Sequence, residues 1–114
     1  MKMNKYPDSI TIAGGVVYKI KYTAEPIPVE GAEEVLYGEV DLSNQVISIW
    51  KGERDENSVA ITLLHEILHA LSQVFQQELT EKQVSVLAVG LVDVIQRNDL
   101  DLRPLGYTHG DVVY

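Results

Sequence analysis

The spacing of apolar and polar residues changes partway along the chain. Over residues 10–50 apolar positions tend to alternate with polar ones, and after residue 55 they recur every three or four residues. The first pattern is typical of strands and the second of helices that each bury one face. We therefore predict an α+β fold in which a sheet over 10–50 precedes helices over 55–76 and 80–98 and a tail over 99–114. A length of 114 residues predicts a single domain, 1–114.

Three segments of the first half are rich in β-branched and aromatic residues, as strands usually are. They cover residues 16–22, 35–42 and 46–50. The polar residues 43–45 between the last two predict a hairpin. Residues 25–28 contain two prolines, which cannot donate a backbone hydrogen bond, so we expect a loop or a sheet edge there. The pattern predicts a sheet of about three antiparallel strands.

The first helix is expected to begin at Asp55 or Ser58, either of which can act as its N-cap. Two adjacent apolar stripes predict that it is mostly buried. They consist of Leu63, Ile67, Ala70 and Val74, and of Leu64, Leu68, Leu71 and Phe75. The remaining sector is polar and includes His65 and His69. We expect this sector to line a cleft.

The second helix is predicted to begin after Thr80, because Thr80 and Gln83 have the spacing of a capping box. Asn98 and Asp99 are expected to end it. One buried face is predicted, made of Val84, Leu87, Ala88, Leu91 and Ile95. This prediction includes no exposed apolar stripe that could form an interface, so the oligomeric state stays open.

The amino-acid composition restricts the kinds of site and partner that the chain can have. The chain has no cysteine, which excludes disulfides, thiolate ligands and cysteine nucleophiles. A formal net charge of -8 makes nucleic acid a poor candidate partner. The charged N-terminus is followed by no long apolar run, so we expect neither a signal peptide nor a membrane span, and a cytoplasmic location.

The segment from His65 to His69 has the pattern H-E-x-x-H. Residues four apart lie on the same side of a helix, so both imidazoles can bind one zinc ion. Glu66 lies beside that position and is the candidate general base, which would take a proton from water activated by the metal. Iron, manganese or nickel can occupy a nitrogen and oxygen site as well, but zinc is the expected cofactor.

A catalytic zinc site usually has three protein ligands, so one more is expected. The metzincin continuation is absent, because Ser72 and Phe75 stand where it has glycine and histidine. Glu81 is the candidate third ligand, since it shares a stripe with Val84 and Ala88 and would otherwise point an unpaired acid toward the core. Its alternative role is that of a first-turn acid favoured by the helix dipole. The other candidate ligands are Glu78, Asp93 and His109.

Geometry restricts the third ligand. A second helix running strictly antiparallel to the first would carry Glu81 past the histidines, given a rise of about 1.5 Å per residue. If Glu81 is a ligand, the first helix must therefore end early or the second must cross it steeply.

Residues 62–71, followed by Leu79-Thr80-Glu81 and residues 84–91, resemble small phage-type metallopeptidases. More distantly they are similar to the ImmA/IrrE-like proteases, in which a later helix carries a glutamate ligand in an E-x-x-A-N-x-F-A pattern. Residues 81–88 resemble that pattern but have Val84 and Ser85 in place of its alanine and asparagine. The resemblance covers residues 35–98 and implies a zincin-like fold, a ligand role for Glu81, and a cleft-lining strand at 46–50 that a peptide substrate would join at its edge.

We therefore predict a zinc metallopeptidase that acts on a peptide or protein, with His65, His69 and Glu81 as ligands and Glu66 as the catalytic base. Tyr107 or His109 would stabilise the oxyanion. The alternative is an inactive zincin-like interaction module that keeps a structural metal. The sequence contains no recognisable specificity pocket, so the substrate is left open.

Overall fold

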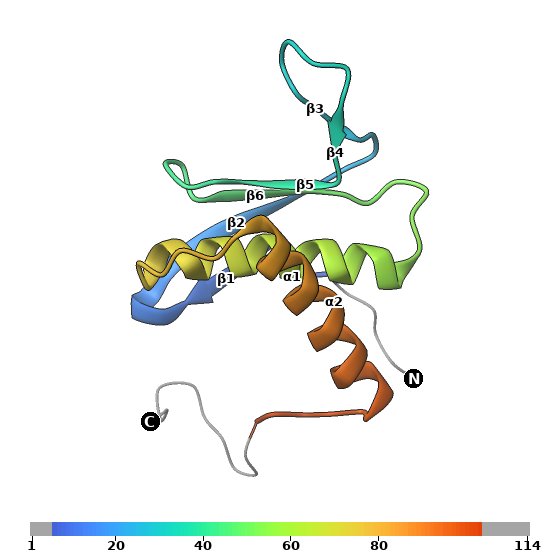
Figure 1. The fold of residues 1–114 in the computed structure, drawn as a ribbon. Helices are drawn as coiled ribbons and strands as arrows, with labels where there is room; N and C mark the ends of the chain where they lie inside the picture. Colours follow the sequence, from blue (N-terminus) through green and yellow to red (C-terminus); the bar gives the residue numbers. More distant parts are fainter. Residues whose placement is uncertain (1–5, 104–114) are drawn as a thin grey trace.

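A long helix covers one face of a four-stranded sheet, and a second helix crosses the first obliquely (Figure 1). The structure is a computed structural model that describes residues 6–103. The predicted α+β class is confirmed. The elements in chain order are β1 Ser9–Ile12, a 3-10 turn Ala13–Gly15, β2 Val16–Thr23, β3 Ile27–Pro28, β4 Val35–Leu36, β5 Gly38–Asp41, β6 Val46–Trp50, α1 Glu56–Val74 and α2 Glu81–Arg97.

The main sheet has the strand order β1-β2-β6-β5. The pairs β1–β2 and β5–β6 are antiparallel, but the central pair β2–β6 is parallel, with Ile20 opposite Ile47. The prediction of about three antiparallel strands is therefore confirmed only in part: two pairs are antiparallel, but the sheet has four strands and its central pair is parallel. Alternation along a strand indicates which side chains face the core, but it does not indicate which strand lies alongside. The two central strands are those that bury two large side chains each.

The predicted strand over 35–42 is divided at Tyr37. Its first part, β4, pairs with β3 in a separate two-stranded sheet, and its second part, β5, forms an edge of the main sheet. The proline-containing segment is thus at an edge, as predicted. The hairpin of β5 and β6 is also confirmed, because Asp41 is paired with Val46 and its carboxylate accepts hydrogen bonds from the backbone and side chain of Asn44 at 3.1 and 2.9 Å.

The core lies between the inner face of the sheet and α1. Its buried side chains are Tyr18 and Ile20 from β2, Ile47 and Ile49 from β6, and Val59 and Ala70 from α1. Leu63 and Ile67 pack against it, so the first predicted stripe of the helix faces the sheet. The second stripe is less buried than predicted, and Phe75 at its end is 56% exposed because α1 has already ended there.

The ends of both helices set the position of the second helix. Asp55 caps α1 by accepting a hydrogen bond from the Ser58 backbone at 2.8 Å, and α1 ends at Val74, slightly before the predicted residue 76. Gln76 follows in a left-handed conformation with a φ of 56° and turns the chain back. The capping box of Thr80 and Gln83 is confirmed at the start of α2.

Only a narrow stripe of α2 is covered, by α1. Its buried residues are Val84, Ala88 and Val92, whereas Leu87 and Leu91 are each 41% exposed. The predicted buried face was therefore too wide, and the expectation that no apolar stripe is left exposed was wrong. The physical reason is that α2 packs mainly against one helix and not against the sheet. Among the described residues, neither helix is long and apolar enough to cross a membrane.

Gly38 lets the edge strand β5 lie very close to α1. A β-carbon built at Gly38 would be 2.8 Å from Cγ2 of Thr62 and 3.1 Å from Oε2 of Glu66. Contacts of 2.8 Å are too short for carbon atoms, so a larger residue would push the strand and the helix apart. The missing side chain at position 38 therefore sets the width of the gap between β5 and α1.

We predict that Gly38→Ala lowers the free energy of unfolding by about 1 to 3 kcal/mol, because the added methyl overpacks this gap. Urea denaturation of the metal-free protein measures the change. Adding Thr62→Ser should recover part of the loss, since serine lacks Cγ2 but keeps the oxygen that accepts a hydrogen bond from Arg54 at 2.8 Å. Unchanged stability in the single variant would contradict the close packing described here.

Candidate metal centre

His65 and His69 lie one turn apart on α1 and point their rings toward a common position. Their Nε2 atoms are 3.2 Å apart, and their side chains keep 19% and 27% of their exposure. The helix spacing brings the residues to one side, and the packing of Leu63 and Ile67 on the sheet fixes which way that side faces. Both imidazoles are therefore partly shielded from solvent.

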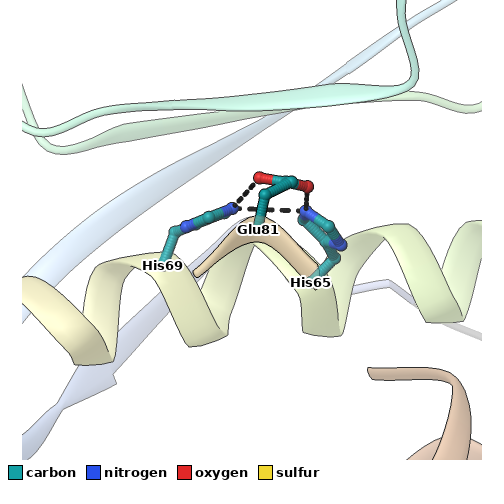
Figure 2. Close-up of side chains that lie close together, drawn as sticks. All are labelled: His65, His69 and Glu81. Carbon is teal, nitrogen blue, oxygen red and sulfur yellow. Dashed lines mark hydrogen bonds and ion pairs between the residues drawn. The ribbon is translucent and has the colours of Figure 1, made fainter. Parts of the chain in front are cut away.

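Glu81, the first residue of α2, places its carboxylate between the two rings (Figure 2). Its Oε2 lies 2.7 Å from Nε2 of His65, and its Oε1 lies 3.0 Å from Nε2 of His69. The structure meets the geometric requirement mainly through the crossing of α2 over α1, since α1 ends at Val74, only slightly before the predicted residue. The third residue predicted for the site thus lies with the other two.

The other candidate ligands do not join this group. Within residues 6–103, the only cluster of potential ligands with atoms inside 4.8 Å of one another is His65, His69 and Glu81. Asp93 instead pairs with Arg97 one turn later on α2, at 2.9 Å. Glu78 is exposed in the connection between the helices. Tyr107 and His109 lie outside the described residues.

The donor atoms lie close enough together to hold a metal ion. Ligands held about 2.0 to 2.1 Å from zinc at tetrahedral angles lie roughly 3.3 Å from one another. The two Nε2 atoms are 3.2 Å apart, and the Glu81 carboxylate places one oxygen 2.7 Å from the first and its other oxygen 3.0 Å from the second, both somewhat shorter than that value. Two imidazoles and one carboxylate would leave one tetrahedral position free, as in catalytic zinc sites. A small outward adjustment of the Glu81 side chain, which is 69% exposed, would complete the fit.

Glu66 is buried beside this cluster. It keeps 6% of its exposure, and burial raises the pKa of its carboxyl group to about 7, with smaller contributions from the negative charges of Glu81 and Glu39. The desolvated carboxylate is costly, because a charge transferred out of water loses its hydration. Near neutral pH this group can therefore both accept and release a proton.

These residues line one cleft of about 610 Å³. Its walls come from the segment around β4 and β5, from α1 and from the start of α2, and the lining residues are Leu36, Tyr37, Gly38, Val40, Ile61, Thr62, His65, Glu66, His69, Glu81, Ser85 and Val89. The strand in the wall is β5. The expectation that residues 46–50 line the cleft was wrong, because β6 is enclosed between β2 and β5.

Arg54 supports the cleft and was missed in the sequence. Its guanidinium group donates to the Trp50 and Ser58 carbonyls at 2.6 and 3.2 Å and to the Thr62 hydroxyl at 2.8 Å, and it lies 4.8 Å from the centre of the Tyr37 ring. It thereby joins the end of β6, the first turns of α1 and the cleft wall. A single arginine before a helix cap carries no sequence signal for such a role.

Comparisons of the chain with protein-family models, curated proteins and solved structures found no match. The resemblance to phage-type and ImmA/IrrE-like proteases therefore stays a prediction from the residues themselves.

We predict that one zinc ion binds per chain and that Glu81→Ala and His65→Ala each abolish stoichiometric binding, because two donors remain. Metal content after gel filtration and the zinc-induced rise in the unfolding midpoint measure this; at 100 times the dissociation constant the bound ion stabilises the fold by about 2.7 kcal/mol. Glu78→Ala is the matched control and should bind zinc normally. Loss of binding in Glu78→Ala, with retention in Glu81→Ala, would reassign the third ligand.

The raised pKa of Glu66 predicts a pH-dependent stability of the metal-free protein. Its carboxyl group has a pKa of about 7 in the fold, above the model value of 4.5, so the fold favours the protonated form. The stability that comes from this preference for the protonated carboxyl group is fully present below pH 4.5. It is lost as the pH rises through 7. Glu66→Gln should therefore be more stable than the wild-type chain at pH 8, by on the order of 2 kcal/mol, and about equal to it near pH 4.5. Urea titrations in chelator at both values test this, and an equal difference at both would contradict it.

Proposed function

We propose that this protein is a zinc-dependent peptidase that hydrolyses a peptide bond with water activated at the metal. The observation that carries the proposal is the convergence of two imidazoles and one carboxylate from two helices, beside a buried acid, in one open cleft. A structural site would not need the fourth position free, nor an ionisable group next to it.

Each residue has a separate role in this proposal. His65, His69 and Glu81 would hold the zinc ion, and a zinc ion bound there would supply a water with a pKa of about 7 and an electrophile for the carbonyl of the substrate. Glu66 takes the proton from the attacking water onto its carboxylate and then gives it to the amine that leaves. In the metal-free chain burial raises the pKa of this carboxyl group to about 7, and the positive charge of a bound ion would lower it and favour the carboxylate that accepts the first proton.

The edge of β5 is the proposed binding position for an extended peptide. Within residues 6–103 this strand pairs with β6 on one side only, so its other edge lies along the cleft and could accept a further strand. A peptide that adds to such an edge gains main-chain hydrogen bonds, while its side chains alternate toward and away from α1. The small gap at Gly38 would place the peptide backbone close to Glu66.

The test is Glu66→Gln, with zinc binding and peptide hydrolysis measured on the same preparation. Glutamine has nearly the same shape but cannot accept the proton, so we expect turnover to fall by about 10² to 10⁴-fold while zinc content is kept. A degenerate peptide mixture, analysed for newly formed termini, serves as substrate. Glu78→Gln makes the same chemical change in the exposed connection between the helices and should keep full activity.

Two outcomes would contradict the proposal. Hydrolysis that survives in Glu66→Gln would show that another group moves the proton. Zinc bound by a wild-type chain that produces no new termini would favour the alternative, an interaction module with a structural metal.

A further inference from the structure

The exposed face of α2 consists of six residues that the rest of residues 6–103 leaves uncovered. They are Val86, Leu87, Gly90, Leu91, Val94 and Ile95, and the five apolar side chains keep 37% to 64% of their exposure. The second half of α2 projects away from the sheet (Figure 1). Contiguous apolar surface of this kind usually marks an interaction site.

The exposed face of α2 has the same spacing when it is read in either direction. Val86 and Leu87 at one end correspond to Ile95 and Val94 at the other, and Gly90 corresponds to Leu91 at the centre. In an antiparallel pair whose two-fold axis passes through the centre of this face, every residue of the face lies opposite another residue of the same face. Antiparallel self-association would therefore cover the whole face.

Gly90 supports close contact at the centre of this face. A glycine inside a helix is destabilising relative to alanine, and here a β-carbon would meet nothing within 4 Å in the single chain. Two ridges with a spacing of four residues run beside each other, Val86-Gly90-Val94 and Leu87-Leu91-Ile95. Such ridges pack into each other's grooves, and the missing side chain at Gly90 leaves room for Leu91 of a second copy.

Charge does not oppose a second copy at this face. The chain as a whole carries a formal charge of -8, which opposes association of two copies through most of its surface. On α2 the acidic residues Glu81 and Asp93 are balanced by the basic residues Lys82 and Arg97. Two α2 helices can therefore approach without net repulsion between them.

We propose that two copies of this chain form a dimer by packing the exposed faces of α2 antiparallel across a two-fold axis between Gly90 and Leu91. The cleft stays open in this dimer, because Glu81, Ser85 and Val89 face it from another side of the same helix. The dimer thus has two independent metal centres, and the inference does not depend on peptidase activity.

Sedimentation equilibrium of the full chain over a wide concentration range tests the proposal. We expect a monomer–dimer equilibrium that Leu91→Glu shifts to monomer, with the dissociation constant raised about a hundredfold or more, since the substitution enters the interface twice. Val89→Glu is the matched control: Val89 is 52% exposed on the same helix but outside the face, so this variant should dimerise normally. A wild-type chain that stays monomeric throughout overturns the proposal.

Gly90→Ala separates an interface role from a structural one. The added methyl should raise the unfolding midpoint of the monomer, because alanine favours the helix and meets no neighbour. It should also raise the dissociation constant about tenfold, because it fills the space for Leu91 of the second copy. A variant that dimerises as tightly as the wild-type chain overturns the packing at Gly90.

Cysteine cross-linking tests the direction of the helices, since the chain has no cysteine of its own. Leu91→Cys places the two thiols next to the proposed axis, and mild oxidation should link them. Val86→Cys places them roughly 14 Å apart along the helices, beyond the reach of a disulfide. Efficient linkage through both positions would overturn the antiparallel arrangement.

Discussion

The contact of the Glu81 carboxylate with two imidazoles, at 2.7 and 3.0 Å, joins the start of α2 to the middle of α1. The rest of the site depends on this contact. The sheet fixes α1 through its buried stripe, and the capping box of Thr80 fixes the direction in which α2 leaves. Since Val84, Ala88 and Val92 bury only a narrow stripe on α1, the packing of α2 and the geometry of the donor atoms are set by the same short interface.

Negative charge is the second constraint on the cleft. Glu66 and Glu81 share it, Glu39 lies close enough to act on Glu66, and the whole chain is acidic. In the absence of a cation, this arrangement opposes folding, because a buried carboxylate loses hydration and its acidic neighbours repel it. Ionisable groups whose position lowers the stability of the fold are typical of functional sites. A divalent ion between the imidazoles would offset both the lost hydration of the buried carboxylate and its repulsion by the acidic neighbours.

α2 has three sides with three different surroundings. One contacts α1, the next lines the cleft with Glu81, Ser85 and Val89, and the third is the exposed apolar face. When the apolar face of a helix is wider than the area that its one neighbouring helix covers, the rest of that face can bind another partner. Because the exposed face and the cleft lie on separate sides, assembly through α2 and access to the metal centre do not compete.

The sequence by itself determined the local features: the α+β order of elements, the hairpin before α1, both helix caps, and the placement of His65 and His69 on one side of a helix. These depend on residues close together in the chain, so period and capping chemistry are sufficient to predict them. It also indicated Glu81, through its place on a stripe and a family pattern, but it did not show how Glu81 reaches the histidines. Only the tertiary structure decided the parallel pairing of β2 with β6, the choice of β5 as the cleft wall, and the crossing of α2 over α1. Each of these is a contact between distant segments, which depends on competition among all apolar faces for one core rather than on any local pattern.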